Sequence, residues 1–507
     1  MIFAHTKEKI IRNKEKRAAM QQTLSTQLSD NITHLKSIFP IGSSFDLVTR
    51  DLYLGETKAF WIGINGFCKT EILQQIFSDL QDPLFMENPR VEDIAKYLNA
   101  KIGYAQAELC SNWKEITDNL LSGPSVLFID GFAQAILLDV RTYPTRGVAE
   151  PDTERVTRGA RDGFVETMLF NTNLIRRRIR IPGLTFEIQK VGTASRTDVA
   201  ISYVAGLVDE KLLKKIKETL KGLQVTSLTM GSKSLEELLI KKSWFHPLPS
   251  VQMTERPDVA CSYLMEGHIL LIVDNSPAVI ILPCTIFQFT QSPEDYYKSP
   301  LVGSYFRFVR FGCILVSLLL MPAFLLIGAY YPEITRKLDL ISTEGLTPQA
   351  LIFYVIAVEF ILDLFKYSAS LNSSRFSGSL SIVGGLIIGD IAINLNWAST
   401  EVLFYAAITL LTSLSLSSIE FSDALRVYRL FLIAVTGLLG LWGFLAGLIL
   451  VTLSALTTPT FGGMSYFWPL FPFNWQALKT LLFRYPTTKA QPSKSWNRGK
   501  PGNNEEL

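Results

Sequence analysis

The sequence has little of what metal proteins and hydrolases need. Its five cysteines are an odd number with no CxxC pair, and its four histidines lie far apart, without a cysteine or carboxylate at ligand spacing. This pattern predicts neither a disulfide framework nor a zinc site. The sequence also lacks GxSxG, HExxH and triad-like groupings. We therefore expect no metal, no cofactor and no enzyme activity.

Three further absences concern nucleic acid, nucleotides and export. A net charge of +3 is too small to predict a phosphate-binding surface. The segment GINGFCKT (63–70) resembles a phosphate loop, but Cys68 occupies the position where glycine must precede the lysine. Basic residues near the N-terminus are followed by no apolar run, so we expect no signal peptide. The first part of the chain should therefore stay in the reducing cytosol.

The length of 507 residues exceeds what one hydrophobic core supports, so more than one domain is expected. Hydrophobic residues make up 48% of the chain, and they concentrate after residue 310 in long runs that carry almost no charge. The sequence therefore predicts an α/β cytosolic domain followed by an all-α multi-pass transmembrane bundle.

The cytosolic domain is expected at residues 41–300, after a solvated, basic helical lead-in at 1–40. Its helices should use two apolar faces, one around Phe164, Met168, Ile175 and Ile179 and one at residues 212–223. Apolar β-rich runs predict strands at 59–64, 125–129, 135–140, 199–204, 269–273 and 278–282. We expect two subdomains with a waist in the interval 206–257.

The transmembrane domain is expected at residues 301–478, before a basic, disordered tail at 479–507. Residues 311–331 are long enough to cross about 30 Å of hydrocarbon. Arg307 and Arg310 precede this run, and the positive-inside rule places both ends of the chain in the cytosol. Further apolar runs lie at 350–365, 380–397, 402–416 and 427–453. We expect an even number of crossings, about four to six, with one of the middle runs as a candidate re-entrant segment.

Ionisable residues inside these runs are candidates for an ion pathway. Glu359, Asp363 and Lys366 share one helix face, and a carboxylate at mid-bilayer is costly unless it faces water or protein. The alternative is that Asp363 and Lys366 neutralise each other near the interface. Asp390 and Asn394 repeat the spacing after a glycine-rich segment.

A stripe of small residues on the last long helix predicts close helix packing. Its members are Gly437, Gly440, Gly443 and Gly447.

Dense charged segments in the cytosolic domain are candidates for contact with partners, and the alternative is a solvated helix face with a loop at its head. The segments are EPDTERVTRGARDGF (150–164), NTNLIRRRIRIP (171–182) and the ERPD sequence that begins at Glu255. The candidate residues are Glu150, Arg158, Gly159, Arg161, Arg176, Arg177, Arg178, Glu255, Arg256 and Asp258.

These three segments, in this order, resemble the A-type subunit of the spore germinant receptor (GerA) family. The resemblance extends from SFDLVTR (44–50) to FGGMSYFWPLFP (461–472). It implies a protein of the inner membrane of a bacterial endospore that acts with B- and C-type partners. It also implies a homo-oligomer, with a pentamer as the expected ring, that conducts ions during germination.

Two other functions stay open on the sequence alone. A secondary transporter should show an internal repeat among its membrane segments, and the sequence has no convincing one. A non-conducting scaffold would use the charged segments only to recruit partners.

Overall fold

The computed structural model describes residues 23–81, 91–101, 106–143, 154, 156–240, 244–331, 333–334, 347–371 and 400–485. Contacts divide the chain into two compact units. The α/β unit contains residues 1–239, 251–283 and 488–507, and the helical unit contains residues 240–250 and 284–487. The boundary between an α/β part and a helical part therefore falls close to residue 283.

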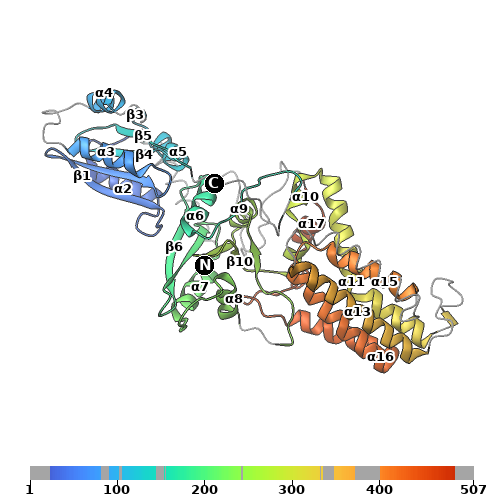
Figure 1. Ribbon diagram of the computed structural model, residues 1–507. Helices are drawn as coiled ribbons and strands as arrows, with labels where there is room; N and C mark the ends of the chain where they lie inside the picture. Colours follow the sequence, from blue (N-terminus) through green and yellow to red (C-terminus); the bar gives the residue numbers. More distant parts are fainter. Residues whose placement is uncertain are drawn as a thin grey trace. The chain divides into compact units, whose positions relative to one another are not determined.

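The first lobe of the α/β unit is a five-stranded antiparallel sheet in the order β1-β2-β4-β5-β3. Helices α2 and α5 pack on one face, and α3 and α4 pack on the other, so the lobe has two apolar layers. Figure 1 shows it in blue shades. Its elements are α2 (Leu28–Ile38), β1 (Leu47–Leu54), β2 (Thr57–Ile64), α3 (Thr70–Gln81), α4 (Val91–Lys101), β3 (Gln106–Cys110), α5 (Trp113–Ser122), β4 (Ser125–Ile129) and β5 (Ala135–Asp139).

The second lobe, drawn in green shades in Figure 1, is also a five-stranded antiparallel sheet, in the order β6-β7-β9-β10-β8. Helices α6 and α9 pack on one face of it, and α7 and α8 contact the same sheet. Its elements are α6 (Met168–Arg178), β6 (Leu184–Val191), β7 (Thr197–Val204), α7 (Glu210–Gly222), α8 (Ser232–Leu239), β8 (Gln252–Thr254), α9 (Pro257–Met265), β9 (Ile269–Val273) and β10 (Val279–Leu282).

The two lobes repeat one architecture. Each begins with a helix, continues through a hairpin, two helices, a strand and a helix, and ends with a second hairpin. The strand orders match, with β6, β7, β8, β9 and β10 in the places of β1, β2, β3, β4 and β5. The opening helices α2 and α6 are both 11 residues long. The α/β unit is therefore an internal structural duplication.

Hydrogen bonds at matching positions confirm the repeat. Asn31 accepts from the backbone N–H of Ser25 at 3.0 Å and donates to its carbonyl at 2.7 Å. Asn171 makes the same two bonds to Val165, at 2.8 and 2.6 Å. Both asparagines are buried, so each holds the loop before its helix by satisfying backbone groups that water cannot reach.

The turn of the last hairpin supplies a second matching contact. Asp130 Oδ1 accepts from the backbone N–H of Leu28, the first residue of α2, at 2.9 Å. Asp274 Oδ1 accepts from the N–H of Met168, the first residue of α6, at 3.1 Å. Each aspartate thus satisfies an otherwise unpaired donor and places negative charge at a helix N-terminus.

The division between the lobes falls between β5 and α6. The interval 206–257, in which we expected a waist, carries α7, α8 and β8, and the strands on either side of it, β7 and β9, pair with each other. That interval therefore lies within the second lobe. The expected solvated lead-in also differs from the structure, because Leu28, Leu35 and Ile38 of α2 are buried in the first lobe's core. Residues 1–22 lie outside the described residues.

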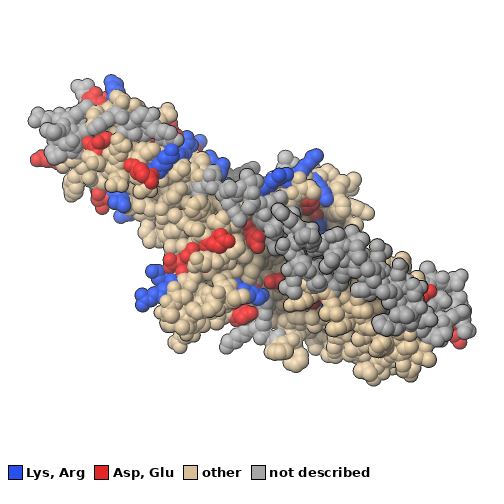
Figure 2. All heavy atoms as spheres, viewed as in Figure 1, with Lys and Arg blue, Asp and Glu red and all other residues tan. Residues whose placement is uncertain are grey.

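The helical unit is built around α11, which contacts α13, α15 and α16. These are the long helices of Figure 1, and Figure 2 shows that uncharged residues dominate the surface over them. The elements are η1 (Ile286–Thr290), α10 (Pro293–Tyr297), α11 (Pro300–Tyr330), α13 (Pro348–Leu371), α15 (Thr400–Leu414), α16 (Ile419–Leu456) and α17 (Trp475–Leu482).

Helix α16 reverses direction at Gly440, whose φ of 60° and ψ of −136° are not helical. The Tyr428 and Ser454 hydroxyls lie 2.8 Å apart, although a straight helix would separate these residues by about 39 Å. A Cβ atom on Gly447 would also lie 2.9 Å from Leu432 Cδ2. Residues 419–439 and 441–456 are therefore two antiparallel arms, and the single helix expected over 427–453 is a helical hairpin.

Among the described residues, α11 and the 38 residues of α16, counted over both of its arms, are long and apolar enough to be candidate membrane spans. The apolar runs expected at 350–365 and 402–416 fall largely in α13 and α15. The run at 380–397 lies outside the described residues, so the number of crossings stays a prediction.

Candidate functional site

Every ionisable side chain that the sequence placed on α13 forms an ion pair with a side chain of α16. We call these six residues the α13–α16 ladder. The pairs are Glu359 with Arg429 at 2.9 Å, Asp363 with Arg426, and Lys366 with Asp423 at 2.5 Å. Positions advance along α13 as they recede along α16, so the two segments run antiparallel. The alternative pairing of Asp363 with Lys366 is replaced by pairs between helices.

The ladder passes from a buried end to an exposed end. The Glu359 side chain is 0% exposed, whereas the Asp423 side chain is 53% exposed. At the buried end Arg429 also donates to the Ser317 carbonyl of α11 at 2.9 Å, so one guanidinium links three helices. The ladder therefore connects the accessible surface of the helical unit with its interior.

Buried atoms of the ladder are left without hydrogen bonds. Among the described residues, Glu359 Oε1, Arg426 Nε and Arg429 Nε are buried and have no hydrogen-bond partner. Such atoms cost free energy in an apolar surrounding, because they have lost water without gaining a partner. The ladder as a whole has three carboxylates and three cationic groups, so its formal charge is balanced. The ladder therefore has buried atoms without partners but no excess of negative charge.

Sequence reasoning missed the α16 half of the ladder. Asp423, Arg426 and Arg429 lie at i, i+3 and i+6 on one helix face. Asp423 and Arg426 lie before the apolar run expected at 427–453, whereas Arg429 lies inside that run and was not among the candidates. The spacing of these three residues is close to that of the oppositely charged residues on α13, and this similarity could have predicted the pairs. The other two pathway candidates, Asp390 and Asn394, lie outside the described residues.

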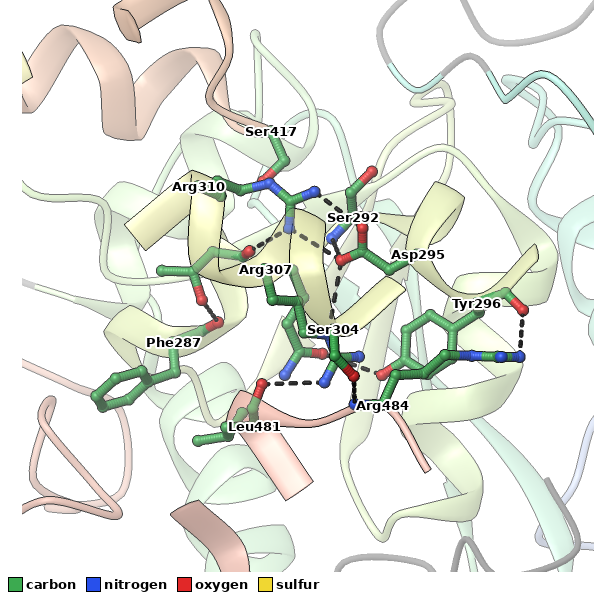
Figure 3. Close-up of polar contacts among 12 residues, drawn as sticks. Phe287, Ser292, Asp295, Tyr296, Ser304, Arg307, Arg310, Ser417, Leu481 and Arg484 are labelled. Carbon is green, nitrogen blue, oxygen red and sulfur yellow. Dashed lines mark hydrogen bonds and ion pairs between the residues drawn. The ribbon is translucent and has the colours of Figure 1, made fainter. Parts of the chain in front are cut away.

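The two arginines expected to flank the first crossing are buried near the start of α11. Arg310 forms a bidentate ion pair with Asp295, with N–O distances of 2.9 and 3.0 Å. It also donates to the Thr290 carbonyl at 2.7 Å. Arg307 Nε lies 3.6 Å from Asp295 and its Nη1 donates to the last carbonyls of α17. Figure 3 shows both guanidinium groups around the same carboxylate. These charges tie α10, α11 and α17 together.

The four glycines of the α16 stripe have different neighbours. A Cβ on Gly437 would lie 3.3 Å from Ile352 of α13, and Gly440 forms the reversal. A Cβ on Gly443 would lie 2.2 Å from the Val435 carbonyl, and one on Gly447 would meet Leu432. The last two glycines therefore face the other arm of the same hairpin, since only a residue without a side chain fits there.

In the α/β unit, two of the charged sequence segments meet at Arg256. Its fully buried guanidinium forms a two-point pair with Asp258 at 3.1 and 2.8 Å. It also donates to the carbonyls of Glu154 and Ala160, at 3.0 and 2.9 Å. Glu154 in turn accepts from the Thr254 hydroxyl at 2.6 Å, and burial raises the pKa of its carboxyl. Arg256 therefore fixes the loop before α6 onto the second lobe.

Arg176 joins two other sequence segments. Its Nε donates to Asp46 at 2.7 Å, and both side chains are almost fully buried. A second nitrogen donates to the Leu184 carbonyl at 2.9 Å, and the guanidinium lies over the Phe186 ring. Asp46 also accepts from Ser44 at 2.5 Å. Since removing one partner of a buried ion pair is strongly destabilising, this arginine stabilises the junction of the lobes.

The other candidates lie nearer the surface. Arg178 pairs with Asp162 at 2.6 Å, and Glu255 is half-buried. Arg177 is exposed and lies 4.7 Å from the Tyr143 ring. Arg158, Gly159 and Arg161 are exposed, whereas Glu150 lies outside the described residues. The candidates thus divide into buried structural arginines and an exposed set that can still contact another molecule.

The described residues give little support to thiol or metal chemistry. Burial raises the pKa values of Cys68 and Cys261 to about 12, so both thiols stay protonated near neutral pH. Burial lowers the pKa of His268 to about 3, which keeps this imidazole neutral. Across the described part of the chain, no three His, Cys, Asp or Glu side chains are grouped so that they could hold a metal ion.

Known proteins resemble this chain over most of its length. It is 33% identical to stage V sporulation protein AF of Bacillus subtilis (strain 168), covering 91% of this chain and 94% of that protein. It is 29% identical to spore germination protein KA of the same organism, covering 91% and 85%. It is also similar to the crystal structure of the N-terminal domain of the A subunit of the Bacillus megaterium spore germinant receptor GerK3, with 26% identity, coverage of 52% and 96%, and a TM-score of 0.39.

The family comparison covers the same length. The family described as Bacillus/Clostridium GerA spore germination protein matches residues 33–495. This range includes every described helix and strand of both lobes and of the helical unit except the beginning of α2. The resemblance inferred from the charged segments is confirmed, and the chain belongs to the GerA family of spore germination proteins.

Proposed function

We propose that the protein is an A-type subunit of a germinant-receptor-like complex in the inner membrane of a bacterial endospore. In this proposal α11, α13, α15 and both arms of α16 lie in the bilayer, and an even number of crossings keeps the α/β unit and both chain ends in the cytosol. Several copies assemble into a ring, and the ring releases cations during germination. Membership of the GerA family and the length and apolarity of α11 and α16 support this proposal.

The α13–α16 ladder is the observation on which the ion pathway depends. Charged groups in a membrane segment normally face water, protein or a translocated ion, because lipid cannot solvate them. The buried ladder atoms without partners would gain hydrogen bonds from water or from a hydrated cation. In an oligomer, each ladder residue would recur around the axis and influence the selectivity of a shared pathway.

The exposed charged residues of the α/β unit supply a candidate contact surface. Arg158, Arg161 and Arg177 project three cationic side chains to the solvent. We propose that they contact neighbouring copies or B- and C-type partners through acidic groups, since opposite charges steer association and fix orientation.

Ion selectivity tests the pathway, because the ladder's balanced charge predicts effects of opposite sign. In planar bilayers containing the full chain, Asp363→Asn should shift the reversal potential in a salt gradient towards anions, and Arg426→Gln should shift it towards cations. The double variant should return close to wild type. Leu364→Ala, which changes an exposed apolar neighbour, is the matched control and should have no effect.

The same preparation separates the candidate functions. Unitary current steps from a ring of several copies support a channel. Saturable accumulation in vesicles without current steps would indicate a secondary transporter, and neither would indicate a scaffold. Currents whose reversal potential is unchanged in both single variants would exclude the ladder from the pathway.

A further inference from the structure

Residues 240–250 lie between α8 and β8 in the sequence, yet they belong by contact to the helical unit. We call the described residues 244–250 of this segment the docking loop. Leu248 is buried in the same apolar cluster as Phe421, Val451 and Tyr466. The chain therefore leaves the second lobe, contacts the membrane helices and returns to complete the sheet.

Hydrogen bonds hold the docking loop against the end of α16. The Ser454 hydroxyl donates to the Phe245 carbonyl at 2.7 Å, and His246 Nδ1 lies 3.1 Å from the Ser454 carbonyl. The hydroxyl of Tyr466, itself buried, donates to the Pro249 carbonyl at 2.8 Å. Hydrogen bonds therefore hold the backbone of the docking loop at Phe245 and at Pro249.

This fixed backbone exposes two large aromatic side chains. Trp244 is 101% exposed and Phe245 is 82% exposed. Such exposure is unfavourable in water, because each ring could bury a large apolar area. A loop built only to connect two elements would have no need to hold these two rings outward.

The position of the loop indicates what covers the rings. Ser454 lies two residues before the end of α16, and the exposed apolar side chains Leu450, Leu453 and Leu456 continue to that end. Tryptophan is enriched where a membrane helix leaves the hydrocarbon, since its ring is apolar and its N–H can still reach water or headgroups.

We propose that the docking loop inserts Trp244 and Phe245 into the headgroup region of a lipid bilayer. The inference depends on the proposed membrane crossing of α16. It would give the chain a contact with the membrane face in addition to its membrane-crossing helices.

The test uses the full chain in nanodiscs of phosphatidylcholine and phosphatidylglycerol, with and without brominated phosphatidylcholine. Subtracting the fluorescence of Trp244→Phe from that of the wild type isolates the emission of Trp244. We expect brominated lipid to reduce this emission by about twofold or more, and aqueous acrylamide to have little effect. Trp442, a 78% exposed residue of α16, supplies the control through Trp442→Phe.

The outcomes distinguish this inference from the function on which it depends. If Trp442 is quenched by brominated lipid and Trp244 is quenched only by acrylamide, α16 is in the membrane but the docking loop is not. If Trp244 is shielded from both quenchers, another copy of the chain covers it and the lipid proposal is wrong. If Trp442 is not quenched by lipid, the proposed crossing itself fails.

Discussion

The two lobes of the α/β unit share a scaffold but differ in how they use charge. Both have the same element order, the same sheet order and the same buried asparagine before the first strand. At the start of the last helix they diverge. The first lobe caps α5 with Asn112, which accepts from the N–H of Lys114 at 2.9 Å. The second lobe has Arg256 at the corresponding position before α9.

The two corresponding residues have different roles. Asn112 is an exposed cap that makes a local hydrogen bond, whereas Arg256 is fully buried and binds a segment about 100 residues away in sequence. Only the second lobe therefore fastens the charged segment that carries Arg158 and Arg161. The first lobe has no counterpart of the Arg256 network at Asn112, so the shared fold does not require that network.

The largest expected effect comes from truncating these two corresponding residues. Arg256→Ala should lower the free energy of unfolding by about 3–5 kcal/mol, because it leaves Asp258 and two carbonyls without their cation. Asn112→Ala should cost only about 1 kcal/mol, as for other helix caps. Urea unfolding of residues 1–283, which contain the apolar clusters of both lobes, measures both losses.

Equal losses in the free energy of unfolding for Arg256→Ala and Asn112→Ala would contradict this difference between the lobes. The lobes would then use the two positions in the same way, and Arg256 would be a cap like Asn112. Failure of residues 1–283 to unfold cooperatively would instead count against the boundary of the α/β unit near residue 283.

In both lobes the sequence predicted the central strands of the sheet and missed the edge strands. The predicted strands β2, β4, β5, β7, β9 and β10 are the three central strands of each sheet. The unpredicted strands β1, β3, β6 and β8 are the edges. Central strands have neighbours on both sides and apolar helices on both faces, so they form continuous apolar runs. Edge strands such as β1 mix buried and exposed positions, and their sequence is not distinctive.

The candidate site was predictable on one helix only. Periodicity placed Glu359, Asp363 and Lys366 on a common face of α13, and the structure agrees. It could not identify their partners, because pairing between helices depends on how α16 packs and where it reverses. A local pattern indicates which side chains share a face, whereas the identity of the opposite face is a tertiary property.

A smaller effect, equal in both lobes, should follow from removing the buried asparagines. Asn31→Ala and Asn171→Ala each leave a backbone N–H and a carbonyl without their partner. Each should lower the free energy of unfolding by about 1–3 kcal/mol, and the losses should add, because the residues lie in separate lobes. Urea unfolding of the single and double variants measures this. A loss of stability confined to Asn171→Ala would contradict this prediction. The two asparagines would then make the same hydrogen bonds but contribute unequally to the free energy of unfolding.

The smallest expected effect on stability, and the sharpest difference between the lobes, involves the helices α2 and α6. Ser37 and Arg177 are the next-to-last residues of these two helices, and both are exposed. Replacing either by glutamate changes the charge of a solvated surface, so the free energy of unfolding should change by less than about 1 kcal/mol. Loss of the Arg177 contact with the Tyr143 ring falls within that range.

Assembly should respond to only one of these substitutions. If the second lobe presents the contact surface, Arg177→Glu reverses a charge within it and should reduce the fraction of detergent-extracted chain found in rings of several copies. Ser37→Glu adds the same carboxylate to the corresponding helix of the first lobe and should leave that fraction unchanged. A mass measurement of the extracted complexes decides between the two. Equal losses would mean that added negative charge anywhere on the α/β unit disturbs assembly, and Arg177 would then have no particular part in the contact.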